Sequence, residues 1–116
     1  MSDLTLGPFV AGEIPPPVVV EFRTRNADGT TGPPIDITGY AVRYIYKERG
    51  ATAAIERTGA LEDAVNGKAR YVWVEADLTT SGNYEAEMWV GNLTNRYASQ
   101  LIRYHVRPNL GVVPAI

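Results

Sequence analysis

Two carboxylates, Glu85 and Glu87, are the residues whose type and spacing come nearest to a catalytic pair. Residues at i and i+2 of a β-strand point to the same face, so these carboxyl groups would lie side by side. Glycoside hydrolases use two such groups, one as an acid and the other as a base or nucleophile. The same spacing is typical of the solvated face of a strand, and we predict that structural role for this pair.

Histidine and cysteine chemistry is restricted by the composition. The chain has a single histidine, His105, and no cysteine. A multi-histidine metal site within one chain, a thiolate site, a disulfide bond and a cysteine nucleophile are therefore excluded. Asn26, Asp28 and Gly29 resemble part of a calcium loop, but no glutamate follows at the required spacing, so we predict a solvated turn. We predict no catalytic, cofactor-binding or metal-binding residues, and no enzyme.

The length and net charge of the chain limit the classes of partner that it is expected to bind. The chain has 116 residues, 45% of them hydrophobic and 21% charged, which is enough for one globular domain with its own core. The formal net charge of -2 gives no general attraction to phosphate backbones, so we predict no nucleic-acid partner. No apolar run approaches the roughly 20 residues of a membrane span. The first residues lack the pattern of a signal peptide, which predicts synthesis in the cytoplasm.

The elements that would position these residues are predicted to be short strands. Segments with alternating or β-branched and aromatic residues occur at 18–24, 40–47, 53–57, 68–74, 83–90 and 97–106. Turn signals separate them, including Asn66-Gly67 and the Asn92-Leu93-Thr94 hairpin. Gly82-Asn83-Tyr84 is typical of a corner in sandwich folds, where a tyrosine hydroxyl returns to nearby backbone. We predict an all-β fold, an antiparallel immunoglobulin-like β-sandwich of about seven strands.

The two ends differ in composition from the middle of the chain. We predict an extended proline-rich arm at 1–17, a β-sandwich domain at 18–107 and a tail at 108–116. Such ends are either frayed tails or segments that gain order along a neighbouring subunit, and we favour the second. Alternation also places Trp89 on an outer face, as an interface anchor or under a loop. The predicted interface residues are Leu4, Leu6, Phe9, Val10, Trp89, Val112, Val113 and Ile116.

An ordered set of motifs resembles a known family. The set consists of Pro34-Ile35-Asp36-Ile37-Thr38-Gly39-Tyr40, Asn66-Gly67-Lys68-Ala69-Arg70-Tyr71-Val72-Trp73, Asp77-Leu78, and Gly82-Asn83-Tyr84-Glu85-Ala86-Glu87. It is similar to the amino-terminal domain family of phage upper baseplate proteins, over roughly residues 18–106. Each motif also has a structural cause, such as the turn at Gly39 or a side-chain to backbone bond from Asp36.

The resemblance implies a structural virion protein of a tailed bacteriophage. The expected role is a β-sandwich adaptor in the tail, baseplate or head-fibre region that docks subunits to the particle. Its expected partners are other virion proteins and further copies of itself, as a trimer or a hexamer ring. The alternative is a carbohydrate- or receptor-binding module that stacks a host glycan on Trp89 and rim tyrosines. The resemblance carries no catalytic residues, and it leaves open the place in the particle and the symmetry.

Overall fold

The computed structural model describes residues 4–115, which form strands joined by tight turns and two short 3-10 helices. In chain order the elements are β1 (Leu4–Val10), β2 (Val18–Glu21), β3 (Arg23–Arg25), β4 (Thr31–Pro34), β5 (Ala41–Glu48), β6 (Ile55–Thr58), β7 (Ala60–Asp63), η1 (Ala64–Asn66), β8 (Lys68–Tyr71), η2 (Glu75–Leu78), β9 (Gly82–Gly91), β10 (Arg96–Ala98) and β11 (Ile102–Arg107). The predicted all-β fold is confirmed.

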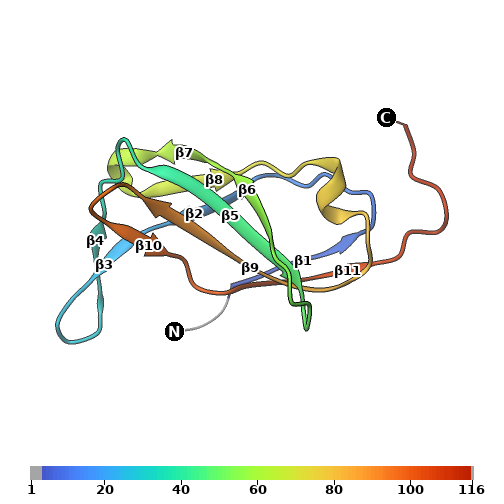
Figure 1. Cartoon of the computed structure of the whole chain (residues 1–116), viewed down its shortest axis with the longest axis horizontal. Coiled ribbons are helices and arrows are strands. Elements are labelled where there is room, and N and C mark those ends of the chain that lie inside the picture. Colours follow the sequence, from blue (N-terminus) through green and yellow to red (C-terminus); the bar gives the residue numbers. More distant parts are fainter. Residues whose placement is uncertain (1–3, 116) are drawn as a thin grey trace.

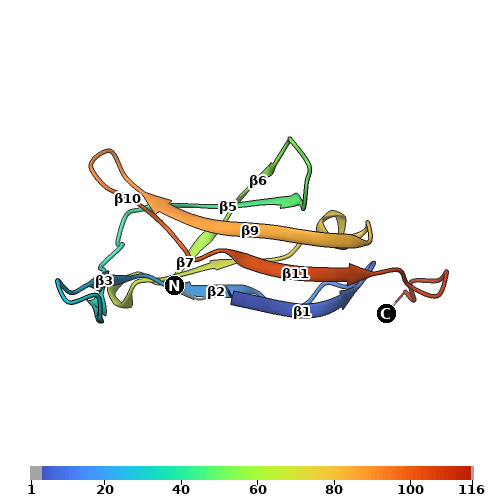
Figure 2. The ribbon, with the colours of Figure 1, turned by 90° about the horizontal axis from the view of Figure 1, so that it is seen from below.

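The strands form two main sheets. The larger follows the order β1-β11-β9-β5-β6, with β10 also paired to β9, and the smaller follows β2-β8-β7. β3 and β4 form a separate two-stranded ribbon. Figures 1 and 2 show β5 and β9 lying over β7 and β8, while the larger sheet curves through β11 and β1 down to the level of β2. The result is a sandwich-like arrangement of two layers.

The core forms because alternation in the central strands puts one row of side chains inside. In β5 the inner row is Val42, Tyr44 and Tyr46, which are all buried. β8 and the residues after it bury Tyr71 and Trp73, whereas the intervening Val72 is 53% exposed. The rings of Tyr44 and Tyr71 stack across the two sheets, with centroids 4.3 Å apart. Stacked and edge-on aromatic pairs thus join the layers.

The N-terminal arm is the main correction to the prediction. Residues 4–10 form β1, which pairs in parallel with β11 at the edge of the larger sheet. Leu4, Leu6 and Phe9 are partly buried and pack against the core, with Phe9 edge-on to Trp73. Prolines are compatible with an edge strand because its outer N–H groups need no partner. The prediction of an extended arm that gains order only along a neighbouring subunit is therefore wrong for residues 4–10.

Two predicted strands are each divided. The segment 18–24 splits at the buried Phe22, whose N–H bonds to Gly67 and whose carbonyl bonds to Ile35, so the chain passes from β2 into the β3–β4 ribbon. The segment 97–106 splits after Ala98, which is paired with Trp89, while Ile102 is paired with Ala86. Three residues therefore oppose two, which is a bulge. The predicted short strand at 53–57 is confirmed as the edge strand β6.

The predicted tyrosine corner is confirmed. The Tyr84 hydroxyl donates to the Thr80 carbonyl at 2.7 Å, and the ring stacks on Tyr104 with centroids 5.3 Å apart. Asp36 likewise accepts a bond from the Thr38 N–H at 3.0 Å, as its motif predicts. In both contacts the two partners are at most four positions apart in the sequence. The local sequence pattern was therefore sufficient to predict them.

Replacing Tyr84 with phenylalanine should lower the free energy of unfolding by about 1 kcal/mol, because one hydrogen bond is lost and the ring packing is kept. Urea unfolding of the variant measures this loss. The matched control is Tyr40→Phe, since the Tyr40 hydroxyl has only a long 3.5 Å contact to Asn95 and is expected to change stability by less than about 0.5 kcal/mol. Equal stability of the two variants would contradict a role for the corner.

Candidate docking site

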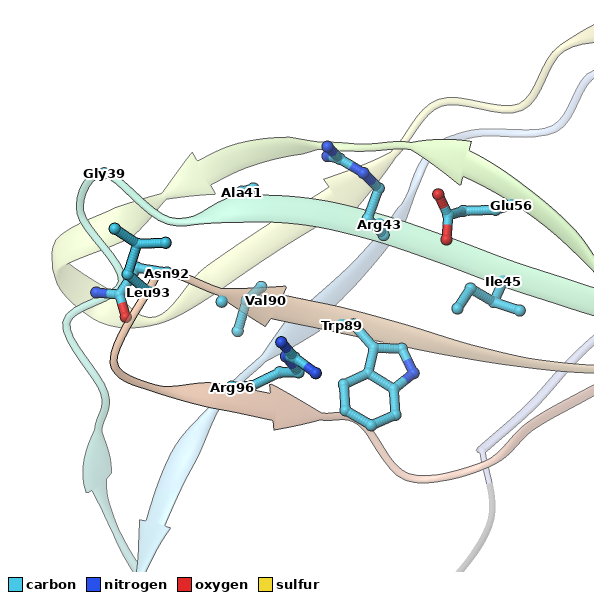
Figure 3. A pocket seen from close by; sticks show the side chains of 11 residues that line it. Gly39, Ala41, Arg43, Ile45, Glu56, Trp89, Val90, Asn92, Leu93 and Arg96 are labelled. Carbon is cyan, nitrogen blue, oxygen red and sulfur yellow. The ribbon is translucent and has the colours of Figure 1, made fainter.

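A groove on the outer face of the larger sheet is the best candidate for a binding site. It has a volume of about 710 Å³ and lies over β5, β9 and the β9–β10 hairpin (Figure 3). Strand pairing places Arg43 beside Trp89 and Trp89 beside Ala98, so these three side chains form one outward row. The lining residues are Gly39, Ala41, Arg43, Ile45, Glu56, Trp89, Val90, Gly91, Asn92, Leu93 and Arg96.

The hollow has a simple steric cause. Ala41 lies directly opposite Gly91 in the β5–β9 pairing, so the floor at that point carries almost no side chain. Long side chains surround it: Arg43 and Arg96 on the strands, and Leu93 on the hairpin (Figure 3). The hairpin is held by Asn92, whose Oδ1 accepts bonds from the N–H groups of Thr94 and Asn95. A rigid turn thus fixes one wall of the groove.

Trp89 is the half-buried aromatic residue of this groove. Its indole Nε1 donates to the Glu87 carboxylate at 2.9 Å, which fixes the ring along β9. Because the polar edge of the ring already has a partner, the remaining accessible surface is apolar. A half-exposed tryptophan of fixed orientation is the kind of side chain that anchors partners.

The charge of the groove differs from that of the whole chain. Two arginines and one glutamate line it, whereas the chain carries a formal net charge of -2. Within residues 4–115, Arg43 and Arg96 form no ion pair, and Arg43 bonds to the Val42 carbonyl at 2.9 Å. Guanidinium groups on an apolar groove can donate to carbonyl or carboxylate oxygens of a bound segment.

The side chains that were candidates for catalysis or metal binding form structural contacts instead. Glu87 holds Trp89, and Glu85 forms an exposed ion pair with Arg49 at 3.8 Å. The His105 ring shares a hydrogen bond with Asn83 Oδ1 at 2.8 Å on the surface. A hydrogen bond from the Thr30 hydroxyl lowers the pKa of Asp28, within the predicted turn. In the part of the chain that the structure describes, no cluster of three or more potential metal ligands occurs, and no helix could span a membrane.

Asp77 belongs to the Asp77-Leu78 sequence motif, and its contacts in the structure explain why an aspartate is needed there. Its side chain is fully buried and accepts four hydrogen bonds, from the hydroxyls of Tyr46 and Tyr71, the Arg57 guanidinium at 3.1 Å and the Val74 N–H at 3.0 Å. The donors come from β5, β6, β8 and the start of η2, so one carboxylate joins both sheets. Leu78, the next residue, is also fully buried. The Asp77-Leu78 motif is therefore a connection between layers.

Comparison with known proteins matches these motifs to a family. A model of the BppU N-terminal domain matches residues 30–116, which contain every motif of the ordered set from Pro34 to Glu87. The chain belongs to the BppU N-terminal domain family. This family membership makes the protein a phage baseplate-associated structural protein and a component of the virion. No curated protein matches the chain.

The tail of this BppU N-terminal domain is exposed, but hydrogen bonds attach its base to the rest of the domain. Asn109 Nδ2 donates to the Ala11 carbonyl at 3.0 Å, and its Oδ1 accepts a bond from the Gly111 N–H. Leu110 and Val112 are 98% and 78% exposed, respectively. Val113 is also exposed and lies against Gly12. Two apolar side chains are thus presented to solvent by an anchored base.

The predicted interface residues occupy three separate places. Leu4, Leu6, Phe9 and Val10 are in β1, Trp89 is in the groove, and Val112 and Val113 are in the tail, whereas Ile116 lies outside the described residues. The sequence did not indicate Arg43, Leu93 or Arg96 as groove residues. They come together only because β5 and β10 both pair with β9, and no local pattern carries that information.

Proposed function

We propose that this BppU N-terminal domain is a non-enzymatic adaptor that docks subunits to the particle in the tail, baseplate or head-fibre region. It acts in several copies, as a trimer or hexamer ring, and its partners are other virion proteins. The proposal excludes nucleic acid and membranes as partners. It places the protein in the virion after synthesis in the host cytoplasm.

The groove around Trp89 is the observation that carries this proposal. It combines a fixed aromatic side chain, an exposed leucine and two arginines that form no ion pair within residues 4–115. Interfaces concentrate their binding energy in such aromatic and arginine residues. The buried Asp77 carboxylate accepts hydrogen bonds from both sheets, which supports the sheet that carries this groove.

A non-enzymatic role is supported by how the candidate groups are used. Glu85, Glu87 and His105 each have a side-chain partner on the open face of the sheet. A general base must reach the proton that it abstracts from substrate, within about 3 Å. These groups instead hold neighbouring side chains in place.

Binding of a host glycan is the second candidate, and the polar part of the groove favours it. Arg43, Glu56 and Asn92 carry planar polar groups and line the same groove as Trp89 (Figure 3). Sugars bind to an aromatic face flanked by such donors and acceptors. In this case Trp89 would contact a saccharide instead of a protein.

The replacement Trp89→Ala in the phage separates the two functions. If the groove docks a virion protein, losing a central anchor should cost about 2 kcal/mol and reduce incorporation into particles about thirtyfold. Quantitative immunoblotting of purified particles measures the incorporated protein. The matched control is Val72→Ala, an exposed valine before η2 and outside the groove, which should incorporate normally.

Other results with Trp89→Ala phage would assign a different function to the groove. Normal incorporation together with lost adsorption to host cells would support the glycan function. Normal incorporation and normal adsorption would contradict both functions for this groove. Thermal unfolding of the purified variant confirms that a loss is not caused by misfolding.

A further inference from the structure

We propose that the exposed tail of one copy, residues 110–115, docks into the Trp89 groove of the next copy. This inference rests on the proposed multi-copy adaptor function and names the segment and the surface that join the copies. The contact is head-to-tail, because two different parts of the surface meet. Such contacts generate rings when the rotation between copies closes.

The chemistry of the tail fits the groove. Leu110 lies in the bend at 110–111, where Gly111 has a φ of 105°, and Val112 begins the residues that follow this bend. Both are more than three-quarters exposed, and the groove offers the apolar surfaces of Trp89 and Leu93. Burial of these side chains against one another removes apolar surface from water on both copies.

The backbone of the tail also fits. Residues 112–115 form no strand, so their carbonyl groups have no sheet partner within the described chain. Arg43 and Arg96 stand on the rim of the groove without an ion pair in residues 4–115. Guanidinium groups donate readily to carbonyl oxygens, so the arginines can bind an extended segment along its backbone.

Geometry decides between a contact within one copy and a contact between copies. The tail leaves one end of the molecule, and the β9–β10 hairpin lies at the other end (Figures 1 and 2). Asn109 bonds to the Ala11 carbonyl and Val113 lies against Gly12, so the tail is held at its own end of the molecule, away from its own groove. The groove of a second copy is accessible to it.

Anchoring of the tail lowers the cost of this docking. Asn109 fixes the base of the tail through its bonds to Ala11 and Gly111, and Val113 lies against Gly12. A segment that is partly ordered before binding loses less conformational entropy on binding. The anchored base distinguishes these residues from a frayed terminus.

A mixing experiment with two defective variants tests the proposal. The tail variant carries Leu110→Asp and Val112→Asp, and the groove variant carries Leu93→Asp. All three positions are at least 78% exposed, so both variants should fold as the wild type does. Sedimentation velocity over a concentration series measures the self-association of each protein.

Head-to-tail docking predicts a specific pattern. The wild type should associate with increasing concentration, and each variant alone should remain monomeric. The mixture should form a one-to-one dimer and no larger species, because one intact tail meets one intact groove. The control Val72→Asp, outside both surfaces, should associate as the wild type does. Trp89→Ala should weaken association at least about tenfold.

Several results would overturn the inference. A wild type that stays monomeric up to millimolar concentration, variants that associate like the wild type, or a mixture without the dimer would each do so. The solution assay and the particle assay fail independently. A one-to-one dimer in the mixture together with unchanged incorporation of Trp89→Ala into particles would refute docking to the particle through this groove. A mixture without the dimer together with Trp89-dependent incorporation would leave the adaptor function standing with a different occupant.

Discussion

Replacing Asp77 with alanine should lower the free energy of unfolding by about 3–5 kcal/mol, a large part of the 5–15 kcal/mol typical of a domain. The substitution leaves the buried hydroxyls of Tyr46 and Tyr71 and the Val74 N–H without their acceptor. Each orphaned buried donor costs about 1–3 kcal/mol. Arg57 loses its ion pair as well, although its side chain is 35% exposed and can turn to water. Urea unfolding followed by tryptophan fluorescence measures the loss.

A neighbouring acid and a double-mutant cycle serve as controls for this prediction. Glu75 is exposed in the same 3-10 helix, so Glu75→Ala should change stability by less than about 0.5 kcal/mol. Combining Asp77→Ala with Tyr71→Phe should cost less than the sum of the single changes, because the orphaned hydroxyl is removed. A loss below about 1 kcal/mol for Asp77→Ala would show that the network is not needed for stability.

The free energy of unfolding should fall steeply above about pH 10, where tyrosines of the unfolded chain ionise. Burial raises the pKa of Tyr44, Tyr71 and Tyr104 in the folded protein. Above this pH the unfolded chain releases protons that the folded chain keeps, so ionisation favours unfolding. The contribution is fully present below about pH 10 and is lost as the pH rises toward the folded values. Each of these tyrosines should reduce stability by about 1.4 kcal/mol per pH unit.

Urea unfolding at a series of alkaline pH values measures this slope. Tyr44→Phe should remove about one third of the part due to the three tyrosines, since the ring stays buried and the ionisable hydroxyl is lost. The part of the tyrosinate absorbance that Tyr44→Phe removes should appear together with unfolding. If that part appears well before unfolding, the prediction is contradicted, because the Tyr44 hydroxyl would then ionise in the folded state.

Features that depend on neighbours in the sequence were predictable. Alternation indicated strands in the segments that form β5, β8 and β9, because side chains of a strand point alternately to opposite faces. The corner at Tyr84 and the turn at Asp36 close through residues at most four positions away. Trp89 was assigned correctly to the outer face, since β9 keeps its alternation throughout.

Features that depend on distant pairing were not predictable. β1 pairs with β11, a contact between residues about 100 positions apart such as Leu4 and Ile102. Proline-rich composition indicated an arm because nothing local shows that an edge position is free to accept such a strand. Immunoglobulin-like detail beyond the sandwich stays a prediction.

The amino-acid sequence alone determined the all-β class, the family and the outward position of Trp89, because all three depend on local periodicity and motif order. The tertiary structure alone decided the burial of Asp77 and the shape of the groove. A carboxylate is buried only where donors from several elements converge, and Tyr46, Arg57 and Tyr71 converge on Asp77 through the packing of two sheets. The groove likewise exists because pairing of β5 and β10 with β9 sets small residues beside long ones.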